Sequence, residues 1–306
     1  MKLIVFTTCK PLRDDDAWRQ EQAIKSWTLL KGIEKKIVVF GDDEGVSELC
    51  EKYDLVHEPE VACLAGVPLV RAMFETAATY ASPEDYLLWT NADMMYFDDM
   101  IDTILAFDKK REEEDIEDFI FVGARTDWHN PQPLENLTKE HFFGNIRMNP
   151  MVGNQRLSTT SWPPSSKYEC HPVQDDGIDY VVHSPTAYIG KIDPRLVIAG
   201  TRHDTLLLQY AIDSEYFACN TGRTITAIHQ NHGITQSTKQ REKQVLEPNN
   251  MRCAPLKYWK LGCGSCSWGA TINEEGRITF LPSGAVLRAA PPPRLLPPPR
   301  AWSMFR

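Results

Sequence analysis

An amide and a carboxylate stand two residues apart directly after a hydrophobic run. Asn91 and Asp93 follow residues 86–89, whose continuous apolar pattern predicts a buried strand. Ligands of open α/β sheets bind at the carboxyl ends of strands, and side chains two apart on a strand point the same way. Oxygen ligands of this kind suit a hard divalent cation, which commonly brings phosphates with it. The pattern therefore indicates a metal-dependent nucleotide or nucleotide-sugar site, with a helix N-cap as the alternative role for the Asp.

Polar residues also follow two earlier apolar runs. Thr7, Thr8 and Lys10 come at the end of the first run, and Asp42 follows the second. Such hydroxyls and a Lys could hold a nucleoside or phosphate, and an Asp there can accept hydrogen bonds from a base or ribose. An ordinary Gly/Asp turn is the alternative for each loop. Arg71, on a later predicted helix, could face phosphate or solvent.

Two segments farther along the chain carry further candidates. Asp204 precedes an apolar helical pattern, where it could cap the helix or act as a general base at the rim of a sugar site. His229 and His232 come at the end of a predicted strand, together with two amide side chains. One of these His residues could complete the coordination of a cation held by Asp93, whereas a satisfied core histidine is the alternative.

The elements that must position these residues alternate regularly through about the first 125 residues. Apolar runs predict strands at 2–8, 36–40, 86–89 and 119–122, with a short one at 55–57. Helical spacing predicts helices at 18–30, 46–53, 67–80 and 98–111. This alternation favours an α/β fold, a doubly wound and mostly parallel sheet with helices on both faces and right-handed crossovers.

The pattern becomes less regular after residue 125. Residues 127–176 predict a long irregular insertion on the acceptor side, with a helix near 134–143. Regular elements return as a strand at 177–183, a helix at 204–212 and a strand at 224–229. We expect a catalytic domain at 1–240 with halves at 1–125 and 126–240, a C-terminal extension at 241–288, and a Pro-rich tail or linker at 289–306.

Composition limits the classes of partner. The chain has 306 residues and a formal net charge of −9, which argues against broad binding to nucleic acid or an anionic membrane surface. The sequence has no apolar stretch of membrane-spanning length and no signal-peptide pattern, so we expect a cytoplasmic protein. Cys263 and Cys266 form a single C-x-x-C, which predicts reduced thiols rather than a zinc site, because paired knuckles are lacking.

Taken in order, these segments resemble a known family. They are the Thr-Thr first loop, FGDDEG, GVPL before a helix, YLLWTNADMMYF, GIDYVVH, the helix begun by an Asp, and AIHQNHG. The sequence resembles glycosyltransferases with the nucleotide-diphospho-sugar transferase fold, also called the GT-A fold, of the family-two-like kind. The resemblance spans residues 1 to about 236.

The resemblance implies a nucleoside diphosphate sugar as donor, Mn²⁺ or Mg²⁺ as cofactor, and a carbohydrate or other hydroxyl acceptor. The family's acidic metal motif, commonly Asp-x-Asp, matches Asn91 to Asp93, so one charge is missing and Asp93 becomes the principal ligand. Donor-loop roles match Thr7, Thr8 and Asp42.

The remaining roles implied by the resemblance concern the acceptor side and the metal. The acidic residue that serves as base in inverting members matches Asp204, with Asp179 as second choice. The late His that touches metal or diphosphate matches His229 or His232, of which His232 is favoured because it lies past the strand. We therefore expect a metal-dependent, inverting glycosyltransferase.

Two other functions are compatible with the same pattern. A sugar-phosphate nucleotidyltransferase shares the sheet, but its first loop is usually basic and Gly-rich, whereas this loop has one Lys and no Gly. A catalytically inactive nucleotide- or sugar-binding module would be consistent with Asn91 in place of an Asp.

Overall fold

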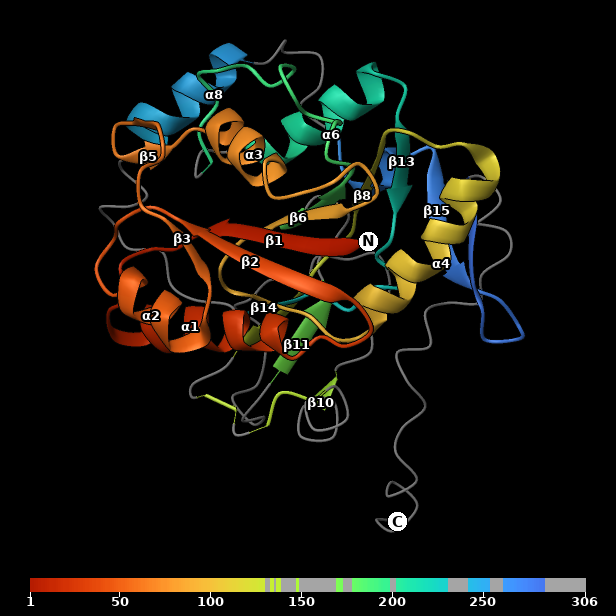
Figure 1. Cartoon of the computed structure of the whole chain (residues 1–306), viewed down its shortest axis with the longest axis horizontal. Coiled ribbons are helices and arrows are strands. Elements are labelled where there is room, and N and C mark those ends of the chain that lie inside the picture. The colour runs from red at the N-terminus through yellow and green to blue at the C-terminus, as the bar shows by residue number, and fades with distance from the viewer. Residues whose placement is uncertain are drawn as a thin grey trace, which may run out of the picture.

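A central sheet with helices on both faces organises the molecule (Figure 1). The computed structural model describes residues 1–129, 133–134, 136–138, 147–148, 169–172, 178–198, 202–230, 242–253 and 261–283. Among the helices in these ranges, none combines the length and the apolar character needed to cross a membrane.

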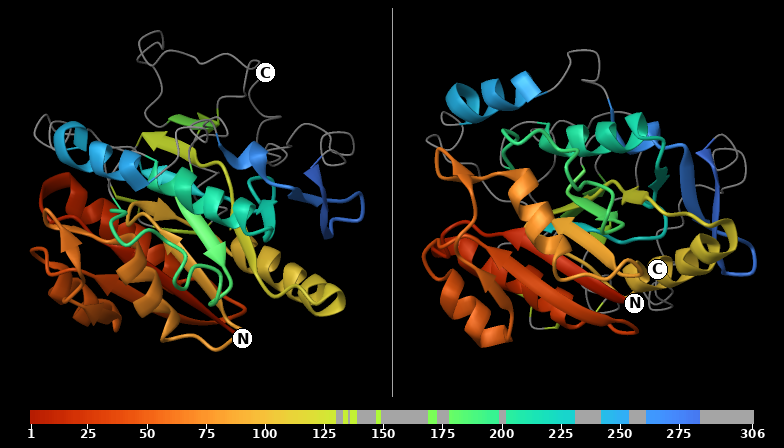
Figure 2. Two further views of the ribbon diagram at one scale, coloured as in Figure 1. Left: turned by 90° about the horizontal axis from the view of Figure 1, so that it is seen from above. Right: turned by 45° about the horizontal axis from the view of Figure 1, so that its top comes forward.

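Within the residues just given, nine strands form the central sheet, in the order β16-β15-β13-β8-β12-β6-β1-β2-β3. Their bounds are β1 Lys2–Thr8, β2 Glu34–Phe40, β3 Val56–Glu58, β6 Tyr86–Thr90, β8 Phe119–Val122, β12 Tyr180–His183, β13 Phe217–Asn220, β15 Trp268–Ile272 and β16 Ile278–Pro282. β12 and β16 are antiparallel to their neighbours, and the other pairs are parallel. Figure 2 shows β15 and β16 (blue) far from β2 and β3 (red to orange).

Alternating side chains of the strands feed two separate apolar cores. Leu3 and Val5 face α1 (Asp14–Thr28), α2 (Val46–Tyr53) and α4 (Asp99–Glu114), whereas Ile4 and Phe6 face α3 (Val70–Ala78) and α6 (His203–Asp213). The second core also receives Leu246 from the π-helix η1 (Glu242–Leu246), which leads into α8 (Glu247–Cys253). A sheet buried on both faces explains the continuous apolar runs of the sequence. The predicted fold class is confirmed.

A second, smaller sheet lies below the first in Figure 1. Its order is β10-β11-β9-β14-β7, with bounds Arg147–Met148, Glu169–Pro172, Thr126–His129, Ile228–Gln230 and Met94–Met95, respectively. β7 follows β6 and β9 follows β8, so this sheet collects chain that leaves the carboxyl ends of central strands. Residues 126–129 and 169–172 are therefore strands, although the sequence pattern predicted an irregular segment there.

Several bounds differ from the predicted ones. α1 begins at Asp14, earlier than expected, and Val67–Pro68 pairs as β5 with β4 (Cys63–Leu64) instead of starting α3. β13, β15 and β16 were not predicted, because their apolar runs are short. β15 follows the 3₁₀ turn η3 (Cys263–Ser265).

Most of the predicted helix at 134–143 and all of the tail at 289–306 lie outside the described residues. The domain boundary at 240 stays a prediction, although β15 and β16 extend the central sheet.

Candidate functional site

The strand order places a topological switch beside β1. From β1 the sheet continues to β2 and β3 on one side and to β6 on the other. In open α/β sheets, ligands bind in the crevice outside the carboxyl ends of the strands at such a point. Thr8 ends β1 and Thr90 ends β6, so the candidate residues that follow them converge at this edge.

Charged and amide side chains meet there in one connected group, which we call the carboxyl-edge cluster: Asn91, Asp93, Arg125, Asp127, Asp179 and His229. Asn91 Nδ2 donates to Asp179 Oδ1 (2.7 Å), and Arg125 pairs with the other oxygen of Asp179. Arg125 Nε also donates to Asp127 Oδ1 (2.9 Å), which accepts from His229 Nδ1 (2.7 Å). The other ring nitrogen, Nε2, lies 3.6 Å from Asp93 Oδ2.

Strand register in the small sheet brings these residues together. His229 is the register partner of Asp127 on parallel β9 and of Met94 on antiparallel β7. Asn91 and Asp93 lie in the turn between β6 and β7, so the two-residue period of a strand does not orient them. Asp93 is not a helix cap either, because α4 begins at Asp99.

His229 carries a positive charge between two carboxylates. Burial opposes its protonation, but the charge of Asp93 and the hydrogen bond to Asp127 outweigh burial and raise the pKa of His229 to about 9. Burial likewise works against ionisation of Asp127, yet the bonds and charges of His229 and Arg125 prevail and lower the pKa of Asp127. At neutral pH, His229 and Arg125 are therefore cations beside the carboxylate of Asp127.

Asp204 lies at the start of α6, beside the cluster. The ring of its neighbour His203 packs edge-on against Trp89 of β6, with centroids 5.1 Å apart. Asp204 is the second residue of the helix rather than its N-cap, and its Oδ1 accepts from the backbone N–H of Thr205 (2.7 Å). Desolvation raises the pKa of Asp204; His203 partly offsets this, and the charge of Asp179 adds to it.

The predicted donor-loop residues divide into two groups. Thr7 is fully buried and its hydroxyl donates to the carbonyl of Thr90 (2.7 Å), so it ties β1 to β6 instead of facing the edge. Thr8 is half-buried, while Lys10 and Asp42 are exposed at the ends of β1 and β2. Only the second group is open to a ligand in this geometry.

Arg71 lies on α3, on the face of the sheet away from the small sheet. Its Nε donates to Glu75 Oε1 (2.8 Å), an ordinary i,i+4 helix pair. None of the contacts that the described residues show joins Arg71 to the carboxyl-edge cluster. His232, the favoured late His, lies outside the described residues.

Arg125 and Asp127 are the members of the cluster that the sequence analysis missed. They stand two residues apart after the apolar run of β8, the same spacing that singled out Asn91 and Asp93. They were passed over because the residues after 125 read as irregular chain. A systematic search for paired polar residues after every apolar run would have found them.

The predicted divalent cation has no ready-made site in the part of the chain described above. Within those residues, no group of three or more His, Cys, Asp or Glu side chains could hold a metal. Both ring nitrogens of His229 face carboxylates, Nδ1 that of Asp127 and Nε2 that of Asp93. The cation therefore stays a prediction.

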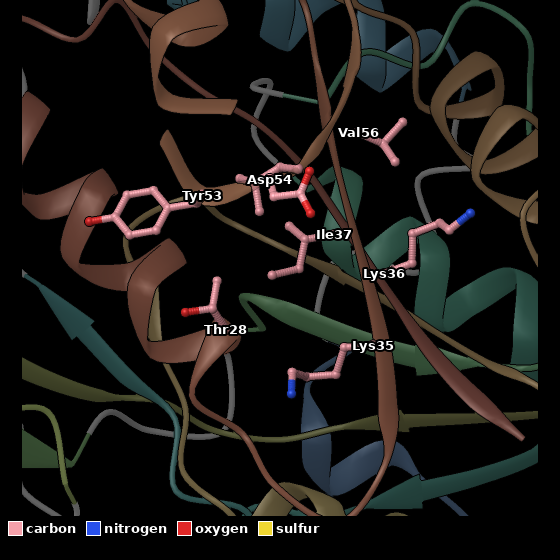
Figure 3. A pocket seen from close by; sticks show the side chains of 8 residues that line it. Thr28, Lys35, Lys36, Ile37, Tyr53, Asp54 and Val56 are labelled. Atoms are coloured by element: carbon pink, nitrogen blue, oxygen red, sulfur yellow. The ribbon is translucent and has the colours of Figure 1, made fainter. Parts of the chain in front are cut away.

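A surface hollow of about 260 Å³ lies at the opposite, amino edge of the sheet (Figure 3). It is lined by Thr28, Lys35, Lys36, Ile37, Tyr53, Asp54, Leu55 and Val56. Its two ammonium groups are occupied, since Lys35 donates to the carbonyl of Leu30 and Lys36 lies over the ring of Tyr80, 5.0 Å from its centroid. The hollow is thus separate from the carboxyl-edge cluster.

Comparison with known proteins gives structural neighbours only. No family model matches the sequence, and no curated protein matches it. The chain is similar to TarS of S. aureus in complex with UDP-GlcNAc, with 16% identity over 44% of this chain and 37% of that chain and a TM-score of 0.32. A second TarS structure aligns over 77% of this chain and 59% of that chain, with 11% identity and a TM-score of 0.40.

Another similar structure is 4-diphosphocytidyl-2C-methyl-D-erythritol synthase from Anaerococcus prevotii, with 9% identity over 82% of this chain and 95% of that chain and a TM-score of 0.39. The chain spans less than two thirds of each TarS structure, and TM-scores below 0.5 carry no functional argument. The function is therefore proposed from the geometry of the cluster.

Proposed function

We propose that this chain is a glycosyltransferase that moves a sugar from a nucleoside diphosphate sugar to an acceptor hydroxyl with inversion. The observation that carries the proposal is the convergence of Asp93, Asp127 and Asp179 at the switch point, with Asp204 beside them. A donor placed outside the ends of β1 and β6 would lie between these groups and the exposed Lys10 and Asp42.

Asp204 is the proposed general base. Inversion needs one carboxylate that takes the proton of the attacking hydroxyl, and a pKa raised toward neutrality improves that proton transfer. Burial raises the pKa of Asp204. The second choice, Asp179, is less suited because Asn91 and Arg125 engage its two oxygens. We assign Asp179 to holding Arg125 and Asn91 at the edge.

Arg125 and His229 are the proposed partners of the departing diphosphate. Fixed cations near developing negative charge stabilise the transition state without reorganisation. Both side chains are largely buried, with 24% and 12% exposed, and carboxylates fix their orientation. A bound Mn²⁺ or Mg²⁺ would add Lewis-acid stabilisation of the diphosphate, and Asp93 remains the residue proposed to contact it.

A screen of sugar nucleotides for hydrolysis and transfer, with Mn²⁺ or with EDTA, tests the proposal. Asp204→Asn is expected to lower kcat by about 10²- to 10⁴-fold and leave the donor Kd nearly unchanged. Asp213→Asn is the matched control, because Asp213 is exposed at the far end of α6. Collapse of donor binding in Asp204→Asn would instead assign Asp204 to ligand contact or to structure.

The same screen separates the other two functions. Turnover of a nucleoside triphosphate with a sugar phosphate, and none of a sugar nucleotide, would identify a nucleotidyltransferase. Calorimetric binding of a nucleoside diphosphate without turnover of any matching sugar nucleotide would identify an inactive binding module. Either result would replace the proposal.

A further inference from the structure

Helix α1 buries polar side chains on the face that packs against the small sheet. Gln20 and Gln22 are only 4% and 5% exposed. An unpaired buried amide costs free energy, so a buried glutamine has to find partners. Gln20 bonds the backbone of Lys10 through both its oxygen (2.7 Å) and its nitrogen (3.2 Å). Gln22 has different partners, and these lead to the candidate site.

A chain of hydrogen bonds runs from Leu134 through Gln22 to Asp93. The backbone N–H of Leu134 donates to Gln22 Oε1 (2.6 Å), and Gln22 Nε2 donates to Gln230 Oε1 (2.7 Å). Gln230 is completely buried, and its Nε2 donates to the carbonyls of Arg19 (2.8 Å) and Asp93 (3.3 Å).

The orientation of the two side-chain amides in this series of hydrogen bonds is fixed at both ends. A backbone N–H can only donate, so the oxygen of Gln22 must face Leu134 and its NH₂ group must face Gln230. Backbone carbonyls can only accept, so the NH₂ group of Gln230 must face Arg19 and Asp93. Reversal of either amide would oppose two donors or two acceptors, which makes the two glutamines one unit.

The unit ends on the backbone that carries two members of the carboxyl-edge cluster. The backbone N–H of Gln230 donates to the carbonyl of Asp93 (3.2 Å), and residue 230 directly follows His229 on β14. Trp27 of the same helix donates through Nε1 to the carbonyl of Met94 (2.7 Å). Helix α1 therefore holds the turn at Asp93 from two points.

We propose that Gln22 is a positioning residue that couples the segment at Leu134 to the backbone of Asp93 and to the strand that bears His229. Leu137 is buried in the core beside α1, so Leu134 and Leu137 both contact the region where the unit begins. This assignment rests on the proposed function, in which Asp93 and His229 act on the donor. Through Gln22, the hydrogen bond of the Leu134 backbone helps to set the positions of Asp93 and His229.

Amide hydrogen exchange of the full chain, measured by NMR, tests the coupling. In Gln22→Met, exchange at the Leu134 amide rises because its acceptor is gone. The backbone N–H of Gln230, which donates to Asp93 rather than to Gln22, is also expected to exchange about tenfold faster. In Gln230→Met, the Leu134 amide is expected to respond as well, because the coupling is reciprocal.

Gln209→Met is the matched control. Gln209 is a buried glutamine with 4% exposure, and its amide donates to Asp213 on α6, away from the unit. Gln209→Met should leave the exchange rates of the Leu134 and Gln230 backbone amides unchanged. If Gln22→Met does not fold, Gln22→Asn replaces it, since the shorter side chain cannot reach both partners. Faster exchange at Leu134 alone, or equal changes in the control, would overturn the coupling.

Kinetics then separate positioning from stability. With the sugar nucleotide that the wild type turns over best, Gln22→Met should lower kcat about tenfold or more, while Gln209→Met keeps the wild-type value. Equal kcat values in the two variants would overturn the positioning role. A wild type that turns over no sugar nucleotide would overturn the proposed function instead, and the exchange result would still decide the coupling.

Discussion

Two histidines with little exposure, one at each edge of the central sheet, differ in charge state: one is a cation and the other is neutral. His229 lies at the carboxyl edge between Asp93 and Asp127, which hold it protonated. His183 ends antiparallel β12 at the amino edge, beside Leu87 of β6. It stacks on Phe74 with centroids 5.1 Å apart, and burial lowers the pKa of His183 to about 4.

The difference teaches that burial alone does not mark a functional edge. The same side chain is a neutral core residue where aromatic rings surround it and a cation where carboxylates do. The carboxyl edge gathers largely buried charge of both signs in one group. Such groups concentrate at functional sites.

The largest expected effect on stability comes from Arg125. Arg125→Met leaves the carboxylates of Asp127 and Asp179 without their shared cation, which should cost about 3–4 kcal/mol of unfolding free energy, as for other buried pairs. Urea unfolding at pH 7 measures the loss. Arg277→Met is the control: its ion pair with Glu275 is exposed, and a change of about 0.5 kcal/mol or less is expected. Equal losses in both variants would remove the distinction between buried cluster and surface pair.

The next effect is the dependence of stability on alkaline pH. Because the pKa of His229 is raised, its contribution is fully present below about 6.5 and is lost as pH rises through about 9. Unfolding free energy should fall by about 3 kcal/mol between pH 6 and pH 9 in buffer with EDTA. His229→Gln should flatten this slope. An unchanged slope in the variant would show that His229 is not protonated in the folded state.

The amino edge should give the opposite slope. The pKa of His183 is lowered, so its neutral form stabilises the fold fully above about 6.5 and this contribution is lost as pH falls toward 4. The expected loss is about 2 kcal/mol between pH 7 and pH 5. Asp127 acts mainly at lower pH, because its pKa is lowered from its usual value. In His183→Leu, the fall in unfolding free energy between pH 7 and pH 5 should become smaller, whatever the stability of the variant at pH 7. If the fall stays as large as in the wild type, groups other than His183 cause it.

The smallest effect belongs to the hollow at the amino edge. Lys36→Met removes the contact of an ammonium with the ring of Tyr80, which should cost less than about 1 kcal/mol. Nucleotide binding should not change, and calorimetry with UDP before and after the substitution measures this. Loss of UDP binding in Lys36→Met would indicate that the nucleotide binds at the amino edge and would contradict the proposed site at the carboxyl edge.

The regular half of the molecule could be predicted because burial on both faces leaves continuous apolar runs. The strands around Val5, Val38 and Leu88 and the convergence of Asn91 and Asp93 at one edge follow from that pattern. The small sheet could not be predicted. Its strands of two to four residues carry no measurable period, and β9 gains its partners from chain about 40 and 100 residues away.

The same limit applies to individual site residues. Thr7 was predicted to hold a ligand; in the structure its side chain is fully buried and its hydroxyl donates to the carbonyl of Thr90, a contact between strands that spacing along the chain does not reveal. The pairing of His229 with Asp127 depends on register between distant segments, which composition and spacing do not reveal. The role of His229 as a metal ligand stays a prediction, because no pattern in the sequence shows that its ring lies between Asp93 and Asp127.

Mapping of amide chemical shifts during titration with UDP, UDP-GlcNAc and CDP, with and without Mn²⁺, tests the central claim most directly. We expect saturable shifts at Thr8, Asn91 and Asp93 and at Gln230 on β14, the residues at and beside the carboxyl-edge cluster. Shifts confined to the amino edge, around Lys35 and Tyr53, or no shift with any nucleotide, would contradict the account.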